Sequence, residues 1–279
     1  MSRNPDPDVL NGVRPRTSLS LPVLMYHDVS QRSCSSSMKR FVVSPNLFEE
    51  HMSALVESGY QATQLSRLGE TSPDPMTRTA FITFDDGFRD VIENALPVLI
   101  GLHLSATFFV PSAYVGCRAE WLPDRDDRKR PLAGWGEFRA AGAYGFEVGS
   151  HGHRHLELDV LRPMAMSDDL KRSKNIIEAE IGSQAMSLAY PFGYHNQDVR
   201  TAASRLGFRF ACETGYGLHR LSGDPMRIRR ILVGPDTSPD HLLALMRTDQ
   251  PTNAQRLRRN TRGVWRQIRR IRGAVGSGR

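Results

Sequence analysis

The stretch Ala80–Phe88, AFITFDDGF, joins a short apolar run to two acids and a glycine. The apolar part, Ala80–Phe84, predicts a buried strand that ends at Asp85-Asp86-Gly87. Adjacent side chains on a strand point to opposite faces, so both acids can serve one site only where the chain bends, and Gly87 permits that bend. Such a pair can place one carboxylate on a metal ion and use the other as a base. The alternative is an Asx turn that closes the strand.

A second polar cluster, Ser150-His151-Gly152-His153-Arg154-His155, follows another short strand predicted at 146–149. The spacing of four residues lets the imidazoles of His151 and His155 face one ion. Two histidines and a carboxylate leave coordination positions open for water and substrate. His153 is a third candidate ligand. The alternative is a polar surface loop, which three histidines among five residues disfavour.

A third cluster, Tyr190-Pro191-Phe192-Gly193, follows a strand predicted at 186–190. It is either a plain turn or a rigid loop that aims a backbone N–H at a reacting oxygen. Further strands are predicted at 21–26, 106–110 and 208–212, and helices at 45–58, 90–100, 167–181 and 198–206. An exposed loop is predicted at 117–131. Strands that alternate with helices indicate an α/β sheet or barrel.

Composition restricts the class of protein. The 279 residues are 39% hydrophobic and 24% charged, which excludes a disordered chain, a collagen-like chain and a disulfide mini-protein. Cys34, Cys117 and Cys212 are far apart and form no disulfide framework or cysteine metal knuckle. No apolar run approaches the roughly 20 residues that span a bilayer. The first 20 residues lack the apolar core of a secretory signal, so a cytoplasmic location is expected.

The basic charge of the chain is concentrated at one end. Residues 255–279 hold nine arginines and no acid, so the rest of the chain carries a net charge of −2. A nucleic-acid-binding surface across the body is therefore not expected. Apolar residues recur at helical spacing in this tail, which predicts peripheral contact with the inner face of an anionic membrane. The alternatives are nucleic-acid binding and a merely solubilising tail. We expect an N-terminal arm (1–20), one domain (21–248) and this tail (249–279).

Together the motifs resemble those of the NodB-homology polysaccharide deacetylases, carbohydrate esterase family 4. The resemblance covers roughly residues 21–235 and rests on AFITFDDGF, ATFFV (106–110), EVGSHGHRH (147–155), SKNIIEAEIG (173–182) and AYPFG (189–193). The opening VLMYHDV (23–29) resembles the subgroup that includes the poly-N-acetylglucosamine deacetylases. The resemblance implies a distorted (β/α) barrel in a single domain, with the site at the carboxyl ends of the strands.

The resemblance also implies the roles of the site residues. Asp85 matches the catalytic base. The ligands of a divalent metal, with zinc expected first and cobalt, nickel or manganese as alternatives, are Asp86, His151 and His155. The backbone N–H of Phe192 would help to hold the oxyanion, and the loop residues assigned to substrate binding are Tyr190, Pro191 and Gly193.

The sequence departs from the family pattern at two positions. The arginine that pairs with the catalytic aspartate is replaced by Ala189. In RIRRI (227–231) a substitute cation is available, and we favour Arg230 over Arg227 and Arg229 as the catalytic arginine. The alternative is that these arginines form a solvated strand face.

The late Leu-x-His motif that supplies the general acid is also absent. His241 is predicted to lie on the surface of a helix. His27, just past the strand at 21–26, is the favoured general acid, and His195 and His219 are the fallback candidates. The alternative for His27 is a structural histidine bonded to a loop carbonyl.

The expected function is metal-dependent removal of N-acetyl groups from amino sugars of a surface polysaccharide or its precursor, with release of acetate. The expected partner is an N-acetylated glycan. One alternative is the same site acting on a cyclic amide such as allantoin. Another is a non-catalytic glycan-binding protein of the same fold, which would be expected to have lost Asp85 or a metal ligand.

Overall fold

The computed structural model describes residues 20–70, 78–214 and 216–248. The predicted arm, apart from Ser20, and the whole predicted tail lie outside these ranges, as does any membrane contact through 255–279. Within the described ranges, no helix is both long and apolar enough to cross a membrane.

The main sheet is parallel, with the strand order β10-β9-β8-β7-β6-β2-β12, and β5 pairs with the first half of β6. Its members are β2 (Val23–Tyr26), β5 (Tyr60–Thr63), β6 (Arg78–Phe84), β7 (Thr107–Val110), β8 (Glu147–Ser150), β9 (Ser187–Ala189), β10 (Phe210–Cys212) and β12 (Ile231–Leu232). Two short pairs lie outside it, β1 (Ser20–Leu21) with β11 (His219–Arg220) and β3 (Asp28–Val29) with β4 (Val42–Val43). Because parallel strands share one direction, their carboxyl ends meet at one rim of the sheet.

The sheet curls toward closure between its outer strands. Cys212 of β10 forms a parallel bridge with Ile228, just before β12. The N–H of Ile228 donates to the carbonyl of Ala211 at 2.8 Å, and the N–H of Glu213 donates to the carbonyl of Ile228 at 2.9 Å. The segment around Ile228 thus fills the space between β10 and β12. The predicted α/β fold, a distorted barrel in a single domain, is confirmed.

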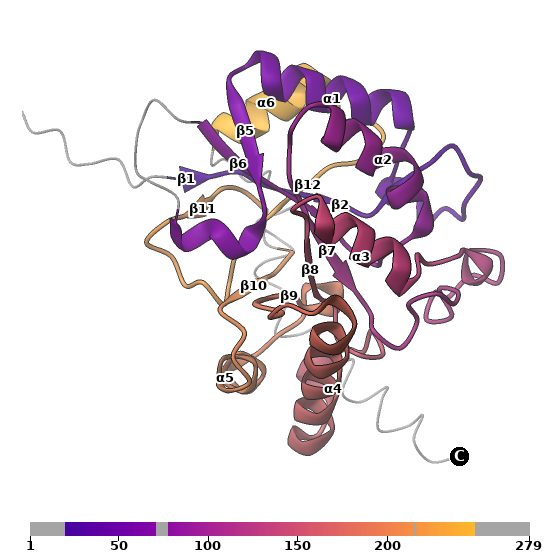
Figure 1. Cartoon of the computed structure of the whole chain (residues 1–279), viewed down its shortest axis with the longest axis vertical. Coiled ribbons are helices and arrows are strands. Elements are labelled where there is room, and N and C mark those ends of the chain that lie inside the picture. Colours follow the sequence, from indigo (N-terminus) through magenta and orange to yellow (C-terminus); the bar gives the residue numbers. More distant parts are fainter. Residues whose placement is uncertain (1–19, 71–77, 215, 249–279) are drawn as a thin grey trace, which may run out of the picture.

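Among the described residues, six α-helices surround the outside of this sheet (Figure 1). They are α1 (Pro45–Glu57), α2 (Arg89–Gly101), α3 (Trp135–Ala143), α4 (Pro163–Ile181), α5 (Gln197–Arg205) and α6 (Pro239–Arg247). Helix α1 begins as predicted, because the hydroxyl of Ser44 accepts the N–H of Leu47 at 3.3 Å and Pro45 is the first helical residue. Helix α1 packs against α2 and α6, while α4 packs against α3 and α5.

The strand alternation places two kinds of residue on the two faces of the sheet. On β6, Ala80, Ile82 and Phe84 pack in the large apolar cluster beneath the helices. Phe81 belongs to a second cluster with Phe109 and other residues. This alternation follows from the period of two along a strand, and it turns the side chain of Thr83 to the same inner face as Phe81. The interior therefore combines aromatic filling with a few polar groups.

The local structure differs from the sequence-based predictions in three places. The segment 117–131 was expected to be an exposed loop, but Leu122, Asp127 and Arg130 in it are buried. Helix α3 was not predicted, because its sequence WGEFRAAGA contains two glycines, which lower helix propensity. Strand β5 was also missed, since its sequence YQAT contains two polar residues and no apolar run.

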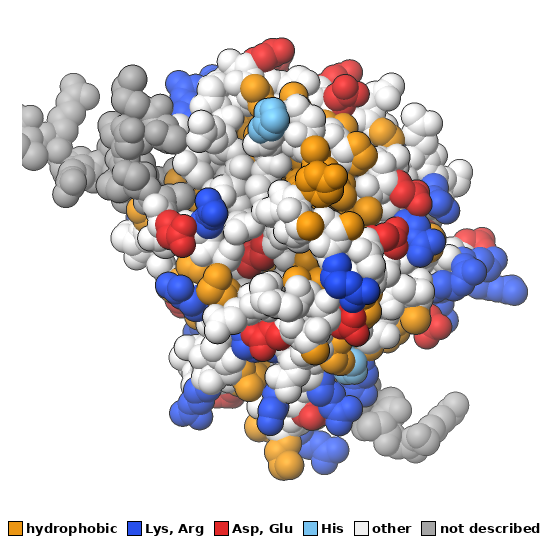
Figure 2. All heavy atoms as spheres, viewed as in Figure 1, with side chains coloured by type: hydrophobic (Ala, Val, Ile, Leu, Met, Phe, Trp, Pro, Cys, Tyr) orange, Lys and Arg blue, Asp and Glu red, His pale blue; other side chains and the backbone are white. Residues whose placement is uncertain are grey.

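The face shown in Figure 2 carries interspersed basic and acidic side chains over the described part of the chain. This pattern agrees with the near-neutral net charge of the body. A field of one sign, as nucleic-acid binding requires, is not seen on this face.

Candidate active site

The three predicted metal ligands lie together at the carboxyl rim of the barrel. Asp86 follows β6, and the segment carrying His151 and His155 follows β8. The Nε2 atoms of His155 and His151 lie 3.2 Å and 3.5 Å from Oδ1 of Asp86. Their ligand atoms lie within 4.8 Å of one another, and all three side chains are buried.

The donor set fits a divalent transition metal. Nδ1 of His151 lies 2.8 Å from the carbonyl oxygen of Ala189, which makes Nδ1 the donor and leaves the Nε2 lone pair for a metal. One carboxylate and two imidazoles form the type of site that keeps open positions for water and substrate. Zinc, cobalt, nickel and manganese all accept such ligands, and the geometry does not select among them.

Backbone strain is concentrated around this site. Among the described non-glycine residues, positive φ angles occur at Asp86 (72°), His103 (55°), His155 (52°) and Phe192 (58°). Three of these four belong to the predicted site. Each left-handed residue costs of order 1–3 kcal/mol and persists only where the surroundings enforce it. The rim is therefore a place where the fold holds side chains in otherwise unfavourable positions.

Arg230 forms a bidentate ion pair with Asp85. Its Nη1 and Nη2 atoms each lie 2.7 Å from a carboxylate oxygen of Asp85. Nη1 also donates to the hydroxyl of Thr83 at 3.2 Å, and Nε donates to the carbonyl of Glu213 at 3.3 Å. Arg230 and Asp85 are 0% and 2% exposed, so the pair is screened from water. Of the three arginines in RIRRI, the structure brings Arg230 to the acid.

His27 lies beside the same carboxylate. Its Nε2 is 4.0 Å from Oδ2 of Asp85, and its ring packs against Phe41 with 4.4 Å between ring centroids. Its Nδ1 is buried and forms no hydrogen bond in the structure. Nδ1 therefore makes no bond to a loop carbonyl of the kind that the alternative of a structural histidine would allow. The ring faces the acids instead.

The electrostatics of the site keep its acids ionised. Burial alone would raise the pKa of Asp85, but Arg230, His151 and His27 outweigh it, and the net pKa lies below its ordinary value. Burial would likewise raise the pKa of Asp86, but the two imidazoles hold that pKa well below its usual range. Burial lowers the pKa of His27, although Asp85 and Asp86 partly oppose this. Two carboxylates can thus remain charged in a buried site.

The Pro-Phe-Gly loop borders the metal ligands. The ring of Phe192 meets that of His155 edge-on at 4.7 Å, and Phe192 is 47% exposed. Pro191 and Gly193 are buried, and a Cβ at Gly193 would overlap Thr214. The side chain of Tyr190 is fully buried, and its hydroxyl donates to the carbonyl of Met226 at 3.2 Å. Any substrate contact by Tyr190 must therefore come from its main chain.

Two of the remaining histidine candidates, His195 and His153, contact other side chains. Nε2 of His195 lies 2.7 Å from Oε2 of Glu213, and Arg200 contacts its Nδ1 at 3.0 Å. Nδ1 of His153 lies 2.9 Å from the hydroxyl of Ser112, and His153 is not part of the ligand group. His219 is buried in β11, and His241 lies exposed on α6 as predicted.

Sequence reasoning missed the contribution of the segment 117–131. The ring of Trp121 stacks on the ring of His155 with 4.9 Å between centroids, at an interplanar angle of 29°. This segment therefore forms one wall of the site. In the sequence, the only sign of this role is that Trp121 is an aromatic residue in a polar stretch. That sign does not indicate which residue the ring contacts.

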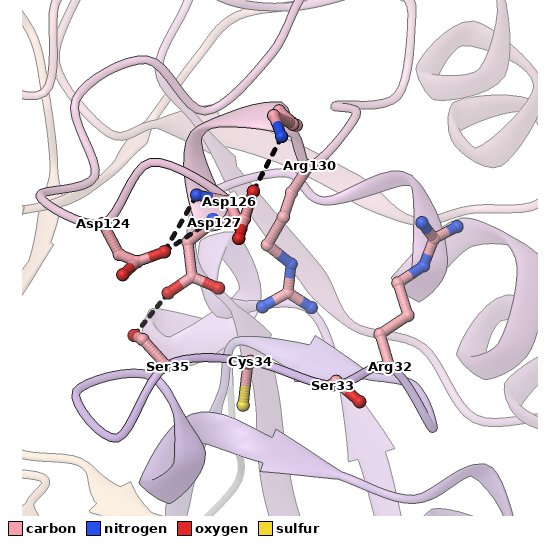
Figure 3. A pocket seen from close by; sticks show the side chains of 9 residues that line it. Arg32, Ser33, Cys34, Ser35, Asp124, Asp126, Asp127 and Arg130 are labelled. Atoms are coloured by element: carbon pink, nitrogen blue, oxygen red, sulfur yellow. Dashed lines mark hydrogen bonds and ion pairs between the residues drawn. The ribbon is translucent and has the colours of Figure 1, made fainter.

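Buried charges anchor this wall next to a hollow of about 400 Å³ (Figure 3). Arg130 points from the segment into the hollow and pairs with Asp28, and its Nη2 lies 3.9 Å from Asp90. Arg32 donates to Asp90 at 3.0 Å, and Ser35 donates to Asp127 at 2.5 Å. These pairs connect the wall to the chain that follows His27.

A second missed residue is Asp169 of α4. Its carboxylate accepts the backbone N–H groups of His153 and Arg154 at 2.8 Å and 3.2 Å. Both amides lie between the two histidine ligands. A signal was present, since Met166, Asp169 and Ser173 share the helical spacing of a buried stripe.

Comparison with known proteins agrees with this arrangement. The model of the polysaccharide deacetylase family matches residues 72–211, half of the chain. YxkH of Bacillus subtilis is 27% identical over 221 residues, which cover 78% of this chain and 73% of that protein. A poly-β-1,6-N-acetyl-D-glucosamine N-deacetylase of Staphylococcus epidermidis is 28% identical over 166 residues, which cover 57% of this chain and 56% of that protein.

The fold has counterparts among solved structures. A Streptococcus pyogenes deacetylase, solved with acetate, superimposes with a TM-score of 0.71 at 22% identity. The match covers 84% of this chain and 100% of that one. At this identity the likeness shows that the two chains share a fold.

Proposed function

The chain belongs to the polysaccharide deacetylase family, and we propose that it is a metal-dependent enzyme that removes N-acetyl groups from amino sugars of a polysaccharide. The observation that carries the proposal is the buried group of Asp86, His151 and His155 beside an arginine-paired Asp85. A non-catalytic relative would have no need to keep a charged, strained and buried arrangement of this kind.

The metal would be held by the three ligands at the rim, with zinc as the first expectation. When bound, a divalent ion polarises the amide oxygen and acidifies water, which are the two activations that amide hydrolysis needs. Nδ1 of His151 is held by the carbonyl oxygen of Ala189, so the ring is already oriented with Nε2 available to bind the metal.

The side chains around the ligands supply proton transfer. Asp85 is in position to accept the proton of the attacking water, and Arg230 keeps it ionised for that purpose. His27, which faces Asp85, would donate a proton to the departing amine nitrogen. The backbone N–H of Phe192 would donate to the acetyl oxygen as negative charge develops on it. Water and the N-acetyl group thereby become acetate and a free amine.

The substrate class follows from the relatives and from the motif YHDV at 26–29. A similar protein from Staphylococcus epidermidis is a deacetylase of poly-β-1,6-N-acetyl-D-glucosamine. We extend that substrate class to this chain. The role of Tyr190, Pro191 and Gly193 is to shape the loop that borders the sugar.

Acetate release tests the proposal directly. Zinc-loaded wild type and Asp85→Asn would be incubated with β-1,6-linked N-acetylglucosamine oligomers, β-1,4-linked oligomers, free N-acetylglucosamine and allantoin. We expect acetate from the β-1,6-linked oligomers with wild type, and at least a hundredfold less with Asp85→Asn, which keeps the shape but loses the base.

Other outcomes would contradict the proposal. Equal acetate release by both proteins would remove Asp85 as the base. Consumption of allantoin without acetate from any glycan would favour the cyclic-amide alternative. Release that persists after chelation and dialysis would contradict metal dependence.

A further inference from the structure

The segment that carries two of the proposed ligands follows an unusual path. The N–H of His151 donates to the carbonyl of Val110 at 2.9 Å and so continues the pairing of β8 with β7. The chain then turns sharply, with φ of +72° at Gly152 and +52° at His155. A left-handed conformation is uncommon for a residue other than glycine and costs of order 1–3 kcal/mol, so it persists only where the surroundings enforce it. Something outside the segment must therefore hold this turn.

Asp169 is the group that holds it. The residue lies on the buried face of α4 and is 1% exposed. Its Oδ2 accepts the N–H of His153 at 2.8 Å, and its Oδ1 accepts the N–H of Arg154 at 3.2 Å. Nε of Arg154 lies 3.6 Å from Oδ1 and partly balances the buried charge. One carboxylate thus fixes two successive peptide groups midway between His151 and His155.

A carboxylate suits this task better than a neutral side chain. Both of its oxygens are acceptors, and each of them meets one N–H donor of the turn. An asparagine has one acceptor and would turn its NH₂ group toward one of the amides. That amide would lose its partner and face another donor, so the turn would relax.

We infer that Asp169 is a positioning residue for metal binding, which acts by fixing the separation of the two histidine ligands. The inference rests on the proposed metal-dependent function. Asp169 touches neither the ligand atoms nor the space between them in any contact described above. Its effect must therefore pass through the peptide groups of His153 and Arg154.

The test compares two adjacent aspartates on the same helix. Asp168 is exposed and pairs with Arg172 one turn along, whereas Asp169 is buried. Zinc affinity would be measured by competition with a chromophoric chelator on Asp169→Asn and Asp168→Asn. We expect Asp169→Asn to bind zinc roughly 10- to 100-fold more weakly, as for loss of other outer contacts of metal sites. Asp168→Asn should match wild type within about twofold.

Two further readouts separate positioning from a loss of general stability. The visible spectrum of the cobalt-substituted protein reports ligand geometry and should change in Asp169→Asn alone. The melting temperature of the metal-free protein reports stability. Weaker zinc binding and an altered cobalt spectrum in a protein that is folded at the assay temperature support the inference. A lower melting temperature with unchanged zinc affinity would overturn it.

A second variant, Gly152→Ala, perturbs the contact with Asp169 from the segment that carries the two histidines. A Cβ at Gly152 would lie 3.0 Å from Oδ2 of Asp169, whereas a Cβ at Gly145, which has φ of +84°, would meet nothing within 4 Å. Both alanine variants strain a left-handed residue, but Gly152→Ala also presses on the carboxylate. We expect weaker zinc binding for Gly152→Ala and wild-type affinity for Gly145→Ala.

The outcomes distinguish this inference from the proposed function. Equal zinc affinities in both alanine variants and wild type would overturn the positioning role. If wild type itself binds no zinc, cobalt, nickel or manganese, the proposed metal dependence fails and the inference fails with it. Metal binding by wild type with no loss in Asp169→Asn would overturn the positioning role alone.

Discussion

Replacing Arg230 by methionine would measure how much the buried ion pair with Asp85 contributes to the free energy of unfolding. The guanidinium makes two contacts of 2.7 Å with Asp85, and both side chains are buried. Methionine fills a similar volume but leaves the carboxylate without its cation. Removing one partner of a buried ion pair costs about 3–5 kcal/mol, because an uncompensated charge remains inside. We expect a loss of this size in the free energy of unfolding at pH 7.

The sign of the pH dependence follows from the pKa of Asp85. In wild type this pKa is lower in the folded state than in the unfolded chain, so the pair stabilises the fold above about pH 4, and the contribution is lost as the pH falls through the folded pKa. Without Arg230, which is the group that lowers this pKa most, we expect burial to raise the pKa of Asp85 above its unfolded value. Lowering the pH then protonates Asp85 in the variant, which removes the unpaired buried charge and recovers part of the lost stability. The difference between the two proteins must therefore shrink as the pH falls from the raised pKa of Asp85 in the variant toward its lowered folded pKa in wild type.

Urea unfolding of the metal-free proteins at pH 7 and at pH 3.5 measures both effects. Arg227→Met is the matched control, since the side chain of Arg227 is half exposed and lies 3.8 Å from Glu213, so that its loss should cost about 1 kcal/mol or less. The double variant Asp85→Asn with Arg230→Met should recover part of the loss. A cost below about 1 kcal/mol for Arg230→Met at pH 7 would refute the reasoning. An equal cost at both pH values would refute it too.

Three other measurements address separate parts of the molecule. Zinc at 100 times its Kd should raise the free energy of unfolding by about 2.7 kcal/mol, and His151→Ala should abolish the increase in a calorimetric scan. His27→Gln should lower kcat for acetate release by roughly 10²–10⁴ while substrate binding stays unchanged, and a loss under tenfold would contradict its role as general acid. Burial lowers the pKa of His51, so stability should fall as the pH drops below about 6.5, where the unfolded chain takes up a proton. Urea titrations at pH 7.5 and 5.5 should show a smaller fall in His51→Gln, and equal falls would contradict this.

The parts of the site that could be predicted from sequence are those encoded locally. Asp85, Asp86, His151 and His155 each follow a short apolar run, and parallel strands bring such positions to one rim. Contiguous motifs need no knowledge of tertiary contacts, so their gathering in space was foreseeable from strand pattern alone. The strands of the sheet that lie in apolar runs were foreseeable for the same reason, whereas β5, with the sequence YQAT, was not.

Partners that are distant in sequence were harder to predict. In RIRRI, alternation places Arg230 on the same face as Ile228, and both are buried, but so short a strand carries little periodic signal. Asp169 required knowing that α4 packs on the turn after β8. The stacking of Trp121 on His155 required knowing that buried charges fold residues 117–131 back over the rim.

The ion pair of Asp85 and Arg230 also limits how early the barrel can close during translation. The two residues are separated by 145 positions in the chain. A ribosome that adds about 5 to 20 residues per second produces the arginine roughly 7 to 30 s after the acid. Throughout that interval the nascent strands carry a carboxylate that cannot be buried favourably. The late insertion of the segment before β12 therefore both closes the barrel and pairs the acid with its cation.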